Sequence, residues 1–496
     1  MRKFIEERVV FLYVSFLLII ANISAISLNY GFSDDYTFFY NYSSNNNLDL
    51  RNMFFAIGRP INGVLLELFF SKLQLISDLR ILRFLSLFGI LVVLFGMHES
   101  FKRHNLSKIE MFFLLIFLFT LPSINLFICW TQYFTAPLAL IFSICSALII
   151  FKTTNKPRIT IFQLVIKYFI SILLLLFSSF IHQTISMYYW VIVGIILFFS
   201  VEDEIKSHFN VKFLFNFVFV WVISMALSYF WIRIFSLSYS GGGLERSILA
   251  TNIFNKIIWF VYEVIIRSLN FHLLIDSKII PIILLIVIIF GLNLFFEEHK
   301  INKITGYFVV TLLIIFSYFP NLIIEENWGS YRTQIALSSM FVILIFISFK
   351  SIIIKLGLRN KQLIFFSIMS FFSISSLVLY SYHQIRNMTY PQSLEISFMK
   401  YQLTKFDNRV QDNIYIIQPS WNDSISSRLF GYDEFGIPSS SQAWAPEPMV
   451  RLLLREMNYD YKNIIIKYLP STNILNFNDS DFILDLRSIR EFKLID

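Results

Sequence analysis

The feature that most constrains this chain is the recurrence of apolar runs long enough to cross a membrane. A helix rises 1.5 Å per residue, so about 20 apolar residues span the ~30 Å hydrocarbon core of a bilayer. Runs near this length recur about eleven times, at residues 9–28, 76–97, 109–123, 131–151, 160–180, 184–200, 211–235, 278–296, 304–320, 334–350 and 362–382. The pattern predicts an α-helical polytopic membrane protein with about eleven transmembrane helices.

The composition agrees with a membrane protein. Of the 496 residues, 56% are hydrophobic and 15% charged, whereas soluble domains have about 45–50% apolar and about 25% charged residues. The net charge of +8 is explained by basic residues in cytoplasmic loops, and nucleic acid is not an expected partner because no soluble segment carries a basic stripe with interleaved aromatics. Two shorter or partly charged runs, 61–71 and 253–275, are typical of helices that lie in the bilayer interface or re-enter it.

Basic residues in the loops predict the orientation. "HESFKRHNLSK", "FKTTNKPR" and "KSIIIKLGLRNK" alternate along the chain with loops that are sparse in Lys and Arg, such as "LPSINLFICWTQ" and "SSFIHQT". The positive-inside rule places the first group and the N-terminus in the cytoplasm. An odd number of spans then places the C-terminus outside.

The composition changes after residue 382. "NIYIIQPSW" and "SDFILDL" have the pattern of strands, and "EPMVRLLLREM" between them has that of an amphipathic helix. The sequence therefore predicts two domains, a transmembrane domain at 1–382 and a small extracytoplasmic α/β domain at 383–496.

Charged residues on the predicted outer side are the candidate site residues. Asp34 and Asp35 directly follow the first apolar run, and Arg59 lies in the same loop, in "AIGRPINGVLLELF", before a proline suited to the first turn of a helix. His182 and Gln183 lie at another outer junction, "SSFIHQT".

A further outer loop, "EENWGSYRTQ", carries Glu325, Glu326 and Arg332. An Arg at the outer start of a span departs from the positive-inside trend, and pairing with an acid or with a phosphate would explain it. Carboxylates can act as a general base and Arg residues can stabilise a departing phosphate. Those two groups are what transfer of a sugar from a lipid-linked phosphate requires.

The case for a metal or a disulfide is weaker. Paired carboxylates suit hard cations, so a divalent metal would fit Asp34 and Asp35, but the sequence has no ligand set that defines a site. The outer-side histidines are far apart in sequence. Cys129 and Cys145 lie in or beside apolar runs and are expected to be small buried residues.

These motifs, in this order, resemble the Gtr-type (type II) membrane glucosyltransferases, which decorate bacterial O-antigen in serotype conversion. The resemblance rests on "DD" followed some 20 residues later by "GRP", on "HQT", on the outer Arg332 and on the C-terminal tail. The chain departs from the family at His182, where the family more often has Tyr.

The resemblance implies a fold of the GT-C class in the bacterial inner membrane, with a site that faces the periplasm. It implies a polyprenyl-phosphate sugar donor, typically undecaprenyl-phosphate glucose, and a surface polysaccharide acceptor. Asp34 or Asp35 would be the base, with the order left open, and Arg59 and Arg332 would contact the phosphate; Gln183, Glu325 and Glu326 are further substrate-binding candidates. The alternatives are a polysaccharide polymerase, a flippase for a lipid-linked glycan and a non-catalytic scaffold.

Overall fold

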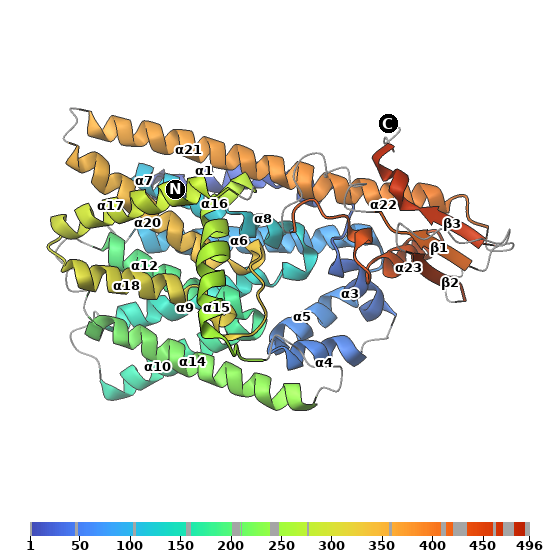
Figure 1. The fold of residues 1–496 in the computed structure, drawn as a ribbon, viewed down its shortest axis with the longest axis horizontal. Coiled ribbons are helices and arrows are strands. Elements are labelled where there is room, and N and C mark those ends of the chain that lie inside the picture. The colour runs from blue at the N-terminus through green and yellow to red at the C-terminus, as the bar shows by residue number, and fades with distance from the viewer. Residues whose placement is uncertain are drawn as a thin grey trace.

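The computed structural model describes residues 2–44, 48–102, 106–154, 160–200, 209, 211–238, 248–274, 277–356, 360–407, 413–419, 434–459, 463–469 and 481–491. Figure 1 shows long helices that run beside one another, with a small sheet at one end. The helices of the first half are α1 (Arg2–Ala21), α2 (Ile23–Ser27), α3 (Asp34–Ser43), α4 (Leu48–Ala56), α5 (Pro60–Phe70), α6 (Leu79–Phe101), α7 (Lys108–Phe119), α8 (Pro122–Cys129), α9 (Ala136–Thr154), α10 (Ile161–Ile181), α11 (Gln183–Ser186) and α12 (Tyr188–Phe199).

The second half continues this helical pattern and adds the strands. Its elements are α14 (Val211–Ser238), α15 (Ile253–Trp259), α16 (Ile266–Asn270), α17 (Ile279–Glu298), α18 (Lys303–Phe316), α19 (Phe319–Ile323), α20 (Ile335–Lys355), α21 (Lys361–His383), α22 (Tyr390–Leu403), β1 (Asn413–Ile417), α23 (Pro446–Glu456), β2 (Ile465–Leu469) and β3 (Asp481–Asp485). Short helical turns include η1 (Ile76–Asp78), η2 (Thr131–Tyr133), η5 (Phe271–Leu273), η6 (Tyr331–Thr333), η10 (Ser439–Ser441) and η11 (Leu486–Glu491), and η4 (Phe260–Ile265) and η7 (Gln384–Thr389) are π-helical.

Seven helices within the described residues are long and apolar enough to cross a membrane. An eighth span results if α7 and α8, which meet at an angle of 58° just before Pro122, cross together. The seven are Ile76–Phe101, Thr131–Thr154, Ile161–Ile181, Phe213–Phe235, Ile279–Glu298, Ile335–Lys355 and Lys361–Leu403. The chain is therefore a helical polytopic membrane protein.

Fewer helices are long enough to cross the membrane than the eleven or so that the sequence predicted. Each of the remaining three apolar runs does form a helix, but the apolar stretches Arg8–Ala21, Gln183–Phe199 and Lys303–Phe316 have 10–17 residues. At 1.5 Å per residue these stretches are about 15–26 Å long, which is shorter than the hydrocarbon core, and α1 reaches 20 residues only with the charged sequence RKFIEER at its start. Several loops that underlie the predicted orientation, including 201–208 and 239–247, lie outside the described residues.

Apolar side chains on the outside of the bundle fit a lipid environment. On α17, Ile279 is 71% exposed and Ile286 is 61% exposed, and on α21 Phe371 is 67% exposed. Large exposed apolar surfaces are rare on soluble monomers and are the normal surface of a span that faces lipid.

The segment from α15 to α16 crosses the long helices at a steep angle, as Figure 1 shows. Its apolar side chains Ile253, Phe254 and Tyr262 are each about 70% exposed. The position of 253–275 along the membrane interface stays a prediction, with which these exposed apolar side chains are compatible.

The C-terminal strands form a parallel sheet in the order β2-β1-β3 within the described residues. Ile414 of β1 is in register with Ile466 of β2 and with Phe482 of β3. Parallel neighbours need a crossover connection, and α23 lies in the connection from β1 to β2. The predicted strand at 413–421, the helix at 447–457 and the strand at 480–486 are therefore present with slightly different ends.

No break in the chain marks the predicted boundary after residue 382. One helix of 43 residues, Lys361–Leu403, runs from the bundle through η7 and α22 to the sheet. The second of two hydrophobic cores joins α22, α23 and the strands to side chains from α3 and α5. The C-terminal elements thus share a core with the loop region that contains Asp34 and Asp35.

Candidate functional site

Asp34 and Asp35 form the first turn of α3. Carboxylates are favoured there because the N-terminus of a helix carries a partial positive charge. Ser33, directly before them, has a φ of 47°, which is an unusual conformation for a residue other than glycine. The turn directs the two acids to different surroundings.

Asp35 is fully buried and holds two segments together. Its Oδ2 accepts hydrogen bonds from the backbone N–H of Phe32 (2.9 Å) and of Thr131 (3.1 Å), and its Oδ1 accepts one from the N–H of Gln132 (2.8 Å). Burial raises the pKa of Asp35 to about 7, and the three amide donors oppose that rise. Asp35 therefore fixes the start of α3 against η2.

Asp34 is half-buried and lines a cavity. Its Oδ2 lies 3.3 Å from the donating Nε2 of Gln132, and its Oδ1 lies 3.4 Å from the hydroxyl of Ser33. Both contacts are long, so the carboxylate remains available to a ligand in the cavity. The structure thus gives the neighbouring acids different positions, with Asp34 in the cavity wall and Asp35 behind it.

Arg59 also lines the cavity, at the turn between α4 and α5. Gly58 has a φ of 77°, and a Cβ added there would lie 2.3 Å from the side chain of Ile232, so only glycine fits this turn. The Nε of Arg59 donates to Oε1 of Gln183 (3.0 Å). Gln183 in turn donates to the carbonyls of Ile57 (2.9 Å) and Gly58 (3.0 Å) and so fixes the turn that carries the guanidinium.

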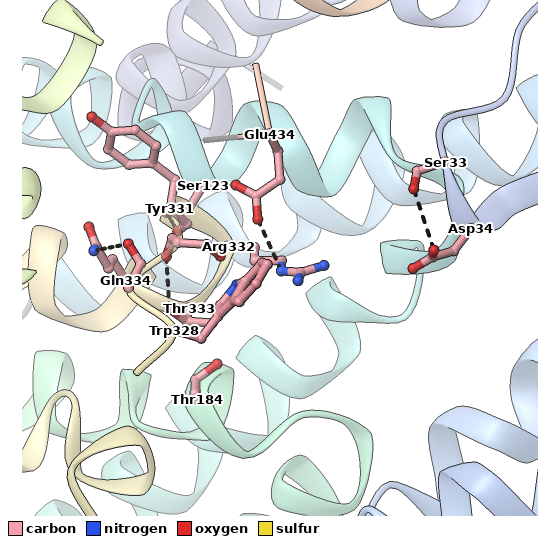
Figure 2. Close-up of polar contacts among 12 residues, drawn as sticks. Ser33, Asp34, Ser123, Thr184, Trp328, Tyr331, Arg332, Thr333, Gln334 and Glu434 are labelled. Atoms are coloured by element: carbon pink, nitrogen blue, oxygen red, sulfur yellow. Dashed lines mark hydrogen bonds and ion pairs between the residues drawn. The ribbon is translucent and has the colours of Figure 1, made fainter. Parts of the chain in front are cut away.

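Arg332 extends from η6 into the same cavity. Its guanidinium carbon lies 5.0 Å from the ring centre of Trp130 and 5.3 Å from that of Trp328, within the range of cation–π attraction. Its Nε lies 3.1 Å from a carboxylate oxygen of Glu434, which is also buried. In the view of Figure 2 the guanidinium group lies between the carboxyl groups of Glu434 and Asp34.

The segment from α15 to α16 holds the loop that precedes Arg332. Lys256 of α15 donates to the carbonyl of Glu326 and to the side chain of Asn327, both at 2.7 Å. Burial lowers the pKa of Lys256 to about 8. Glu325 is exposed, accepts from the N–H of Thr251 (2.8 Å), and is not among the residues that line the cavity.

The cavity has a volume of about 200 Å³ and brings together five of the seven site residues predicted from the sequence. Asp34, Arg59, Gln183, Glu326 and Arg332 line it, whereas Asp35 and Glu325 do not. The rest of the wall is largely apolar and aromatic: Phe38, Met53, Phe54, Ile57, Tyr133, Met225, Tyr229, Ile232, Leu249, Phe319, Pro320, Ile323, Ile324 and Trp328.

His182 also lines the cavity, and its ring nitrogen Nδ1 lies 2.9 Å from the hydroxyl of Thr184.

The sequence pattern did not single out Gln132 or Glu434 as site residues. Gln132 follows Trp130 in "LPSINLFICWTQ", which the sequence predicted to be an outer loop, and its position between two apolar runs was a signal that could have identified it. Glu434 carries no such signal, because its role depends on a contact with a residue about 100 positions earlier.

The described residues contain no group of three or more His, Cys, Asp and Glu that could hold a metal ion. No family model matches the chain, and no curated protein matches it in sequence. What the site can do therefore has to be argued from its geometry. A carboxylate and two guanidinium groups around an apolar, aromatic-lined cavity can accept a proton and bind an anion in one place.

Proposed function

We propose that this chain is a membrane glycosyltransferase that moves a sugar from a polyprenyl-phosphate donor to a surface glycan. The observation that carries the proposal is the joint lining of one cavity by Asp34, Arg59 and Arg332, which come from three separate parts of the chain. A GT-C-type fold of the Gtr family and a cavity that faces the periplasm belong to the same proposal.

In the proposed reaction the acceptor hydroxyl oxygen attacks the anomeric carbon of the donor sugar. The bond between that carbon and the phosphate oxygen breaks, and the phosphate leaves with the electron pair. Asp34 takes the proton from the acceptor hydroxyl, since it is the carboxylate in the cavity that has only long hydrogen bonds. Arg59 and Arg332 stabilise the negative charge that develops on the leaving phosphate.

The remaining wall suits the other parts of such a donor. Tyr133, Tyr229 and Trp328 offer aromatic faces on which a sugar ring can pack. Met225 and Ile232 lie on α14, a candidate span, so the wall on that side is apolar enough for the first units of a polyprenyl chain. Ion pairing of Arg332 with Glu434 orients the guanidinium before a phosphate arrives.

The proposal is tested in cells that lack the gene. They are complemented with the wild type, with Asp34→Asn, or with Asp407→Asn as a matched control on an exposed carboxylate. Membrane accumulation is measured by immunoblot and the surface glycan by mass spectrometry. We expect an added hexose with the wild type and with Asp407→Asn, and its loss with Asp34→Asn at equal accumulation. Identical glycans in cells with and without the wild type would contradict the function, and full modification by Asp34→Asn would contradict the base assignment.

A further inference from the structure

The backbone directly before Asp34 is hydrogen-bonded to a residue in the C-terminal part of the chain. Ser33 has a φ of 47° and a ψ of −107°. A residue other than glycine is strained in such a conformation, and it persists there only where the surrounding structure fixes it. The backbone N–H of Ser33 donates to the hydroxyl of Ser439, at 2.8 Å.

Ser439 lies in η10, and two side chains of α22 hold it. Its hydroxyl donates onward to Oε1 of Gln392 at 2.6 Å. Its backbone N–H donates to Oε2 of Glu395 at 3.0 Å. The other oxygen of the Glu395 carboxyl accepts from the N–H of Ser440 at 3.0 Å and from the Ser440 hydroxyl. Ser439, Gln392 and Glu395 are all nearly inaccessible to solvent, so water does not compete with these bonds.

The rest of α3 is also hydrogen-bonded to residues in the C-terminal part of the chain. The hydroxyl of Thr37, one turn beyond Asp34, donates to the carbonyl of Trp444 at 3.1 Å. Arg455 of α23 donates to the hydroxyl of Ser43 at the end of α3, at 2.7 Å. The helix that starts with Asp34 is therefore fixed at its beginning, in its first turns and at its end by residues near the C-terminus.

We propose that Ser439, oriented by Gln392 and Glu395, is a positioning residue for Asp34. Its hydroxyl fixes the N–H of Ser33, and this sets the direction in which the next side chain enters the cavity. The inference rests on the proposed function, because it assigns a rate effect to the placement of the base. It gives the C-terminal elements a role in the reaction without any contact with the substrate.

The experiment measures kcat and KM of purified protein with polyprenyl-phosphate glucose as donor and glycan from cells that lack the gene as acceptor. Ser439→Ala removes the hydroxyl, and Ser439→Thr retains it. Ser441→Ala is the matched control, because the Ser441 hydroxyl donates within its own turn, to the carbonyl of Pro438. We expect kcat of Ser439→Ala to fall about 10- to 100-fold with an unchanged KM for the donor, since a misplacement near 1 Å can cost about 10²-fold. Ser439→Thr and Ser441→Ala should stay near the wild-type rate.

A double-mutant cycle separates positioning from a general loss of structure. If Ser439 acts through Asp34, then Ser439→Ala should leave the residual rate of Asp34→Asn unchanged. An equal fold-loss in both backgrounds, or a kcat of Ser439→Ala within twofold of the wild type, would overturn the inference. Should Ser439→Ala fail to accumulate, Ser439→Cys fills the same space with a weak hydrogen-bonding group, and a wild-type kcat there would overturn it too. Full activity of Asp34→Asn would instead show that the proposed function itself is wrong.

Discussion

Exchanging the two adjacent carboxylates one at a time should separate a rate effect from a stability effect. Asp34→Asn keeps the size of the side chain but removes its negative charge and its ability to accept a proton. Its two hydrogen bonds are long, at 3.3 and 3.4 Å, so the change in unfolding free energy should stay below about 1 kcal/mol. Loss of a positioned general base should lower kcat by about 10²- to 10⁴-fold.

Asp35→Asn should lower the unfolding free energy more than it lowers kcat. At pH 8, above its pKa of about 7, both oxygens of the carboxylate accept backbone N–H groups, two on Oδ2 and one on Oδ1. An asparagine can place its oxygen at one position only, and its NH₂ then opposes the N–H of Gln132. A buried donor without an acceptor costs about 1–3 kcal/mol, so we expect a loss of about 2 kcal/mol in unfolding free energy.

The assay is a thermal melt of each purified variant in the same detergent at pH 8, together with kcat per folded molecule. We expect Asp35→Asn to melt about 2 °C lower than the wild type with a kcat within about tenfold, and Asp34→Asn to melt normally with almost no activity. The opposite pattern, a stable but inactive Asp35→Asn beside an active Asp34→Asn, would refute the assignment of Asp34 as the base.

Arg332→Lys should lower kcat at least about 10-fold, since an ammonium group lacks the planar fork that binds phosphate and packs between two tryptophans; wild-type kinetics in this variant would contradict the phosphate role. Gly58→Ala should lower the melting temperature, because its Cβ would overlap Ile232 and its φ is positive, and an unchanged melting temperature would show that the turn can relax. Burial lowers the pKa of His272 to about 3, so below its unfolded value of about 6.5 only the unfolded chain takes up the proton. Stability should therefore fall by about 2 kcal/mol between pH 7 and pH 5, and melts at both values should show a smaller fall for His272→Gln.

The sequence pattern located most of the long apolar helices and most of the residues that line the cavity, for physical reasons. Apolar runs form helices in a bilayer because every backbone group must be satisfied within the segment. Loops that share one side of the membrane are brought to one end of the bundle, so Asp34, Arg59 and Arg332 meet although some 300 residues separate the first from the last. The short helices such as Gln183–Phe199 show the limit, because polar residues at the junctions end them early.

The separate positions of Asp34 and Asp35 could not be predicted. Their local sequence is nearly symmetric, and the difference arises from the N–H groups of Thr131 and Gln132, which are almost 100 positions away. The contact between Ser33 and Ser439 spans 406 positions. Neither helix nor strand periodicity contains information on such pairings, which follow only from how the finished elements pack.

The continuous helix Lys361–Leu403 has a mechanical consequence. Its 43 residues correspond to about 64 Å, which is roughly twice the thickness of the hydrocarbon core. If one half of the helix crosses the core, the other half extends about 34 Å beyond it. At the end of a ~34 Å arm, a tilt of about 5° displaces the tip by about 3 Å, and hydrophobic mismatch is a known cause of tilt. Gln392 and Glu395 lie on this arm. We expect turnover in reconstituted vesicles to vary with lipid chain length, and turnover independent of bilayer thickness would show that the arm does not transmit tilt to the start of α3.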